Sequence, residues 1–316
     1  LAVSLTDFVQ GCIMFVALVL VPVVAYQEFS NADKMMNFAY ESIPHFSEGM
    51  QNVTLLGLIS SLSWGLGYFG QPHIIVRFMA IRSVSDIKIA RRIGMSWMTV
   101  TIVGALATGL VGIAYANKFD MKLSDPETIF IVFSELLFHP MISGFLLAAI
   151  LAAIMSTISS QLLVSSSSLT EDIYRVMSKK EATEQEMVKM GRLGVAGVAI
   201  VASLLALDRS NSILSLVSNA WAGFGAAFGP LILFSLYKHN LTHKAAMAGI
   251  VSGAATVLFW IYAPVLADGQ ALSSVMYEMI PGFIVSSVVI WVTSAIDTDP
   301  CKKTVDTFHE AGRVLA

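Results

Sequence analysis

The sequence has few charged residues, only two cysteines and no cluster of basic residues. Charged residues make up 13% of the 316 residues, whereas soluble domains contain about 25%. Apolar residues make up 56%, which is typical of a chain surrounded by lipid. Cys12 and Cys301 stand in unrelated contexts, which argues against a disulfide framework or a cysteine-based metal site. The lack of a basic block argues against a nucleic-acid partner.

Motifs of catalysis are missing as well. The sequence has no HExxH zinc motif, no phosphate-binding loop and no GxSxG elbow, so we expect neither an enzyme nor a bound cofactor. Its apolar stretches lack the charges that a proton relay needs. The first residues, Leu1–Ser4, carry neither a translation start nor the pattern of a signal peptide, and we expect the chain to begin inside a longer protein.

Long apolar stretches dominate what is present. Spanning the hydrocarbon core of a bilayer takes roughly 20 apolar residues. About eight stretches meet this length, and we predict an all-α membrane protein in which residues 1–316 form a single transmembrane domain. The predicted spans are 7–26, 51–80, 90–116, 139–166, 190–207, 212–237, 244–265 and 280–297. Residues 126–138 are short and amphipathic and are predicted to form a surface helix.

Basic residues alternate between the loops and give an orientation. Of the 19 lysines and arginines, all but four fall in one set of loops and in the tail, and the four exceptions are Lys34, Lys118, Lys122 and Arg209. Because cytoplasmic loops carry the excess of basic residues, we predict that the basic loops and the tail at 300–316 are cytoplasmic.

The second predicted span contains an interruption. Gly65, Gly67, Gly70 and Pro72 fall close together near its middle. Glycine costs about 1 kcal/mol in a helix interior and proline about 3 kcal/mol. Interrupted helices in carriers mark the binding site, because freed backbone groups can bind ions and zwitterions. The alternative is a proline kink with close glycine packing.

Two aromatic residues accompany this interruption. Trp64, Tyr68 and Pro72 follow one another at intervals of four residues and would share one helix face. The two rings suit a small apolar ring or a cationic amine. An ordinary aromatic stripe in the bundle core is the alternative.

The fourth predicted span changes from small apolar residues to hydroxyls at Ser156, Thr157, Ser159 and Ser160. Hydroxyl and carbonyl oxygens are hard ligands that suit an alkali cation. The alternative is that these hydroxyls bond the carbonyl one turn back.

Two further features keep two interpretations each. Asp7 lies at the start of the first span, where it either guides cations or is a helix-start acid favoured by the helix dipole. Residues 221–230, rich in glycine and aromatics, act either as a gate or as a close-packing surface.

Four segments together resemble sodium/proline symporters of the solute:sodium symporter family. They are Ala2–Asp7, Ser63–His73, Ala153–Ser159 with the following Ser/Thr-rich run, and Trp221–Pro230. The resemblance covers nearly the whole chain in order. It implies an inverted-repeat bundle related to amino-acid/sodium symporters, of which this chain holds about eight of about thirteen helices.

The resemblance also implies roles for individual residues. Ser156 and Thr157 would give hydroxyls to sodium, with the Ala153 carbonyl as a third ligand. Trp64, Tyr68 and Pro72 would line a proline pocket, and Asp7 matches an acid linked to sodium-dependent activity.

These observations predict a bacterial inner-membrane carrier that couples inward sodium flow to L-proline uptake. Its partners would be proline, sodium, the lipid bilayer and the missing N-terminal part of the same protein. The alternatives are a family member for pantothenate, a sugar or a short acid, and a membrane sensor or transporter–kinase hybrid.

Overall fold

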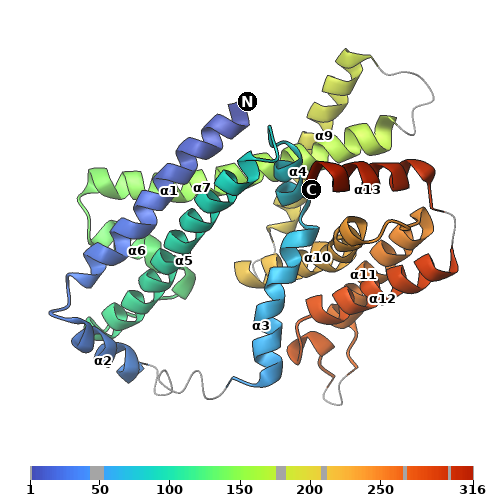
Figure 1. The fold of residues 1–316 in the computed structure, drawn as a ribbon. Helices are drawn as coiled ribbons and strands as arrows, with labels where there is room; N and C mark the ends of the chain where they lie inside the picture. Colours follow the sequence, from blue (N-terminus) through green and yellow to red (C-terminus); the bar gives the residue numbers. More distant parts are fainter. Residues whose placement is uncertain are drawn as a thin grey trace. The chain divides into compact units, whose positions relative to one another are not determined.

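The computed structural model describes residues 2–42, 53–175, 183–207, 212–265, 269–297 and 300–315. These residues are almost entirely helical (Figure 1). Seven of the described helices are long and apolar enough to cross a membrane, and a shorter apolar segment covers Leu55–Gly70. Of the basic residues used for the orientation, Lys179, Lys180 and Arg209 lie outside the described residues.

Contacts divide the chain into two compact units. The first contains Leu1–Asn52 and Ile81–Val201, and the second contains Val53–Ala80 and Ala202–Ala316. The sequence predicts a single transmembrane domain, and this division into two units does not test that prediction. The interrupted span and the hydroxyl-rich helix fall in different units, so each site is described within its own unit.

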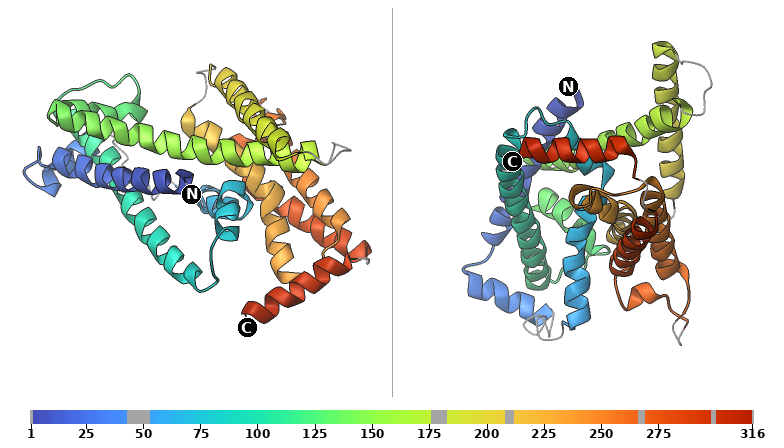
Figure 2. Two further views of the ribbon diagram at one scale, coloured as in Figure 1. Left: turned by 90° about the horizontal axis from the view of Figure 1, so that it is seen from above. Right: turned by 45° about the vertical axis from the view of Figure 1, so that its right-hand side comes forward.

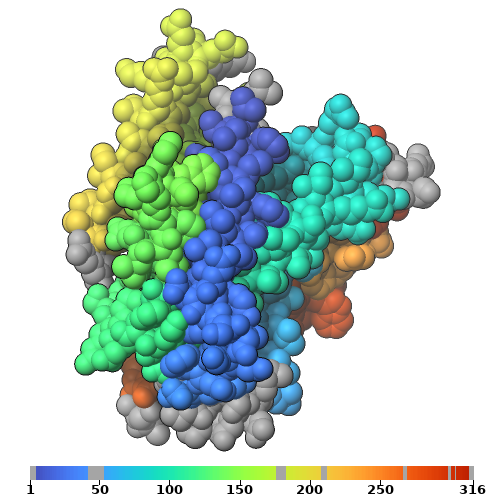
Figure 3. All heavy atoms as spheres, turned by 90° about the vertical axis from the view of Figure 1, so that its left-hand side faces the viewer, coloured from blue at the N-terminus to red at the C-terminus, as the bar shows by residue number. Residues whose placement is uncertain are grey.

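The first unit is built around long apolar helices. Its elements are α1 (Ala2–Tyr26), α2 (Ala32–Ser42), α5 (Asp86–Lys118), η3 (Pro126–Thr128), α6 (Ile129–Leu136), α7 (Pro140–Ser167), η4 (Ser168–Tyr174) and most of α9 (Glu184–Leu205). Both α5 and α7 contact α1, and the space-filling view shows α1 running along this face of the unit (Figure 3). A helix was predicted within 126–138 and is present there as η3 and α6, whereas α2 had no counterpart in the sequence prediction.

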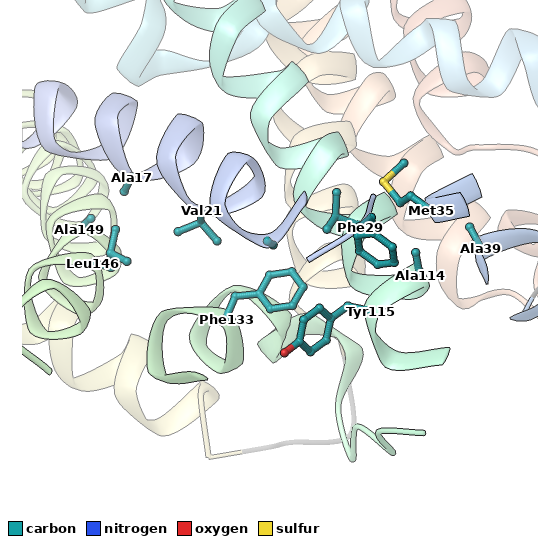
Figure 4. Close-up of a cluster of buried hydrophobic side chains, with 12 residues drawn as sticks. Ala17, Val21, Phe29, Met35, Ala39, Ala114, Tyr115, Phe133, Leu146 and Ala149 are labelled. Carbon is teal, nitrogen blue, oxygen red and sulfur yellow. The ribbon is translucent and has the colours of Figure 1, made fainter. Parts of the chain in front are cut away.

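A compact apolar core holds the ends of these helices together. Phe133 of α6 is fully buried and meets Tyr115 of α5 edge to face, with ring centroids 5.2 Å apart. Leu146 and Ala149 of α7 lie beside Ala17 of α1 (Figure 4). Burial of a large apolar side chain contributes about 1.5–3 kcal/mol in water. The core therefore fixes α6 against α1 and α5.

The second unit contains the interrupted span and the last helices. Its elements are α3 (Leu55–Gly67), η2 (Tyr68–Gly70), α4 (Pro72–Met79), α10 (Ile213–Tyr237), α11 (His243–Tyr262), η5 (Leu272–Ser274), α12 (Met279–Ile296) and α13 (Lys302–Leu315). Helices α10, α11 and α12 pack against one another, as the views in Figure 2 show. The tail, which the sequence prediction left without an element, forms α13.

Small residues explain how closely these helices pack. Gly249 of α11 faces Ile290 of α12, and Gly253 of α11 faces the backbone of Ala226 in α10. A side chain at either glycine would overlap its neighbour. Small residues allow membrane helices to approach in this way. The same kind of packing lets α10 approach the interrupted span.

Candidate functional site

The second span is interrupted where the glycines and proline predict. Helix α3 begins after Thr54, whose hydroxyl accepts a hydrogen bond from Gly57 N at 3.0 Å, and ends at Gly67. The 3₁₀ turn η2 follows, and then Gln71 is extended with φ −82° and ψ 113°. Pro72 occupies the start of α4, where its missing N–H costs no hydrogen bond. The predicted interruption, here called the break (residues 67–71), is confirmed.

Two glycines of the break are required by the approach of α10. A Cβ on Gly67 would lie 2.7 Å from Cε2 of Trp221, and one on Gly70 would lie 2.7 Å from Cα of Gly225. Nothing lies within 4 Å of a Cβ built on Gly65. Gly67 and Gly70 therefore serve the packing of α10 on the break, and Gly65 does not.

Hydrogen bonds tie both sides of the break to one residue of α10. The indole N–H of Trp221 donates to the Trp64 carbonyl at 2.9 Å, near the end of α3. The side-chain amide of Gln71, just before α4, donates to the Trp221 carbonyl at 3.2 Å. Gln71 is only 4% exposed, so this bond satisfies a buried amide.

Four rings gather beside the break. Trp64 stacks on Trp221, with centroids 6.1 Å apart, and on Tyr277, with centroids 5.8 Å apart. Tyr68 meets Trp221 edge to face at 4.9 Å. We call Trp64, Tyr68, Trp221 and Tyr277 the aromatic cluster. Trp64 thus has two aromatic neighbours from later parts of the chain.

Tyr277 is fixed by two further bonds. Its hydroxyl donates to the Ser218 carbonyl of α10 at 2.9 Å, and its backbone N–H donates to the Ser60 hydroxyl of α3 at 3.3 Å. Burial raises the pKa of Tyr277 to about 12, and the nearby Glu278 carboxyl adds to the rise while the Ser218 bond opposes it. Tyr277 is therefore a neutral hydrogen-bond donor that joins α3 to α10.

Sequence reasoning found part of this cluster. It singled out Trp64 and Tyr68, and the structure brings both to Trp221. Pro72 lies across the break at the start of α4. Tyr277 was missed, because its position before α12 gives no periodic signal. Trp221 was noted only within the stretch 221–230, whose buried Ala222, Gly225 and Gly229 agree with the packing interpretation; the gate remains a prediction.

The hydroxyl-rich part of α7 is organised around one carbonyl. The Ser156 and Thr157 hydroxyls each lie 3.1 Å from the Ala153 oxygen and donate to it. The Ser160 hydroxyl donates to the Ser156 carbonyl at 2.8 Å. The structure therefore has the backbone bonding that was the alternative to an ion site. It also places the three predicted sodium ligands together, so that their oxygens form one small group.

Other predicted site features fall elsewhere. Asp7 lies in α1 and is half-buried. Among the residues that the structure describes, no group of three or more His, Cys, Asp or Glu side chains could hold a metal. Glu278, just before α12, is 3% exposed, and its Oε1 has no hydrogen-bond partner within the described part of the chain. Burial raises the pKa of this carboxyl.

Comparison with known proteins gives consistent matches. The model of the sodium:solute symporter family matches residues 1–253. The chain is 52% identical over 315 residues to the osmoregulated proline transporter OpuE of Bacillus subtilis, covering 100% of this chain and 63% of that protein. It is 53% identical over 310 residues to the high-affinity proline transporter PutP of the same organism, covering 98% of this chain and 64% of that protein.

Two more matches extend this result. Sodium/proline symporter 2 of Staphylococcus saprophyticus is 52% identical over 304 residues, covering 95% of this chain and 59% of that protein. A solved structure of a Na⁺-coupled sialic acid symporter in an outward-open state aligns with a TM-score of 0.72 at 20% identity. That alignment covers 95% of this chain and 63% of the solved chain. The chain thus spans less than two thirds of the length of these relatives.

Proposed function

We propose, from the premise that this chain belongs to the sodium:solute symporter family, that it forms the later part of a sodium-coupled L-proline carrier. The longer protein that would contain these 316 residues is called the full-length carrier below. The observation that carries the proposal is the break beside the aromatic cluster. Interrupted helices at bilayer depth occur where backbone lines a cavity or is buried in protein.

The chemistry of the break suits proline. The end of α3 and the start of α4 meet at the break, and these two helix ends carry partial charges of opposite sign. A zwitterion can place its ammonium and its carboxylate at these two ends. The exposed face of Tyr68, which is 46% exposed, offers an aromatic surface for a small apolar ring and for its cationic nitrogen. Trp64 and Pro72 are proposed to complete this wall.

Sodium is proposed to bind at the oxygens of α7. Ala153, Ser156 and Thr157 supply three neutral oxygens in one group. When the ion binds, the two hydroxyls would turn their lone pairs toward it and give up their bonds to the Ala153 carbonyl. Asp7 is proposed to take part in ion coupling. The remaining ligands would come from other segments of the full-length carrier.

Coupling follows if sodium prefers one conformation. An ion that binds the outward-open state more tightly shifts the population toward that state, and proline then binds there. The positions of the basic loops favour a tail at 300–316 in the cytoplasm, and the bacterial relatives support a bacterial inner (plasma) membrane as the location. The chemistry is transport by alternating access, without a covalent step.

The test is uptake of labelled proline by proteoliposomes that contain the full-length carrier. We expect uptake to require an inward sodium gradient and to resist competition by pantothenate, sugars and short acids. Thr157→Ala should raise the sodium concentration for half-maximal uptake, because it removes one of the three oxygens. Thr157→Ser keeps the hydroxyl, so its sodium concentration for half-maximal uptake should stay near that of the unaltered carrier. An unchanged sodium dependence in Thr157→Ala would exclude the α7 site.

A second measurement concerns the 316-residue chain alone. We expect no sodium-dependent proline uptake from it, because other ligands of the proposed sites would lie outside it. Uptake by this chain alone in proteoliposomes would contradict that expectation.

A further inference from the structure

The two ends of the break are bonded to the same residue of α10. Trp221 donates its indole N–H to the Trp64 carbonyl at 2.9 Å and accepts from the Gln71 amide at 3.2 Å. Trp64 precedes the break and Gln71 closes it. A single residue therefore fixes the separation of the two sides.

Each bond meets a need that the interruption creates. The last four carbonyls of a helix have no partner within that helix. At the end of α3 the N–H of the C-cap residue Tyr68 donates to the Leu66 carbonyl, and the Trp64 carbonyl accepts from Trp221. Trp221 supplies this donor from another helix. Gln71 lacks a capping bond from its own side chain to α4, and it uses that buried amide to reach Trp221 instead.

Packing shows that the indole is fitted to its place. A side chain on Gly67 would overlap the indole, so glycine at this position lets Trp221 reach the Trp64 carbonyl. The same indole stacks on Trp64 and meets Tyr68 edge to face. Hydrogen bond, glycine contact and ring contacts thus all act on the segment Trp64–Tyr68.

We propose that Trp221 is a positioning residue for the substrate, which holds the break open at a fixed width and sets the orientation of Trp64 and Tyr68. This role rests on the proposed function, in which those two side chains contact proline. In this proposal Trp221 acts through these two side chains and does not itself contact the substrate. Its loss therefore weakens proline binding while leaving the later steps of the transport cycle intact.

The test compares the Michaelis constant and the maximal rate of proline uptake at saturating sodium in the full-length carrier. A hydrogen bond between neutral groups contributes a modest free energy, and its loss would let Trp64 and Tyr68 shift. Trp221→Phe should therefore raise the KM for proline about fivefold. The maximal rate per folded carrier should change by less than about twofold, the split expected when only binding is weakened. Gln71→Leu removes the other bond and should raise the KM about twofold.

A double variant separates positioning from general damage. Gly67→Ala displaces the indole without removing it and should also raise the KM. Because both substitutions break the same bond, the combination Gly67→Ala/Trp221→Phe should be no worse than the stronger single variant. If the two substitutions acted independently, the rise in KM of the double variant would instead be the product of the two single rises.

Trp260→Phe is the matched control. The Trp260 indole also donates to a backbone carbonyl, that of Met276 at 3.0 Å, within the same unit. We expect its KM for proline to stay unchanged. An unchanged KM in both Trp221→Phe and Gln71→Leu, or an equal rise in Trp260→Phe, would overturn the positioning role. A different result, the absence of sodium-dependent proline uptake in the unaltered carrier, would contradict the proposed function and this role with it.

Discussion

Polar groups on the two sides of the break bond to another helix, whereas the hydroxyls of Ser156 and Thr157 bond within their own helix α7. Trp221 and Gln71 connect α10 with the break over a long sequence separation. Ser156 and Thr157 donate to the Ala153 carbonyl, one turn back. The geometry of the break therefore depends on tertiary packing, whereas the arrangement of the Ser156 and Thr157 hydroxyls depends on their own helix.

This difference predicts how the two regions respond to substitution. Changes at the break should alter stability and transport together, because the geometry of the site is also the packing of α10. Changes at the α7 hydroxyls should leave stability nearly unchanged and alter only the response to sodium. The predictions below test this contrast, beginning with the largest expected effect.

Gly70→Ala should cause the greatest damage. Its Cβ would lie 2.7 Å from Cα of Gly225, and backbone cannot move aside as a side chain can. Overpacking of this kind costs about 1–3 kcal/mol. We expect a lower melting temperature of the full-length carrier in detergent, measured by intrinsic fluorescence, and a loss of proline uptake.

Gly65→Ala is the control for this prediction. It lies in the same segment, but nothing stands within 4 Å of an added Cβ. Alanine is favoured over glycine within helices by about 1 kcal/mol in soluble hosts. The melting temperature should stay level or rise. Equal destabilisation by the two substitutions would show that α10 does not constrain the break in the way described.

Glu278 should make stability depend on pH. Its carboxyl is buried before α12, and burial raises its pKa in the folded protein. The folded state then holds the proton more tightly than the unfolded state. The contribution to stability is complete below the ordinary pKa and is lost as the pH rises through the raised pKa.

Glu278→Gln tests this dependence because glutamine cannot ionise. Between about pH 4 and pH 9, the melting temperature of the unaltered carrier should fall relative to that of Glu278→Gln. The exposed Glu135 provides the control substitution Glu135→Gln. A constant difference between Glu278→Gln and the unaltered carrier across this range would mean that the carboxyl does not titrate there.

Tyr277→Phe should have a smaller effect. It removes the hydroxyl that donates to the Ser218 carbonyl at 2.9 Å and leaves the stacked ring in place. The loss of one hydrogen bond costs about 1 kcal/mol, so the melting temperature should fall by a few degrees. Tyr262→Phe, at a residue that is 75% exposed, should have no measurable effect. Equal shifts of the melting temperature in the two variants would show that the Tyr277 hydroxyl does not stabilise the contact between α3 and α10.

Local sequence signals predicted the break well. Glycine and proline disfavour a helix interior whatever surrounds them, so Gly67, Gly70 and Pro72 indicate an interruption from the sequence alone. The reason for glycine at 67 and 70, the close approach of α10, required the structure. The apolar stretches likewise predicted the helices of the bundle, because hydrocarbon thickness sets their length.

Residues that depend on distant partners were harder to find. Tyr277 lies 213 positions after Trp64 in the sequence, and no local pattern links them. Trp221 stood out only because it begins a stretch rich in glycine, and its bond to the Trp64 carbonyl required the structure. In α7 the pattern of hydroxyls identified Ser156 and Thr157, but composition alone could not distinguish ion ligands from hydroxyls that bond their own helix.

Ser156→Ala compared with Ser160→Ala addresses that last ambiguity and has the smallest expected effect on stability. Both serines donate to a carbonyl of their own helix, at 3.1 Å for Ser156 and 2.8 Å for Ser160. Only Ser156 shares its acceptor with Thr157. Both variants should keep the free energy of unfolding within about 0.5 kcal/mol of that of the unaltered carrier, as for substitutions that break no packing. If the oxygens around Ala153 bind sodium, only Ser156→Ala should raise the sodium concentration for half-maximal proline uptake, by about threefold. Equal sodium dependence in the two variants would mean that the hydroxyls of α7 serve the helix alone, and that the ion binds through other parts of the carrier.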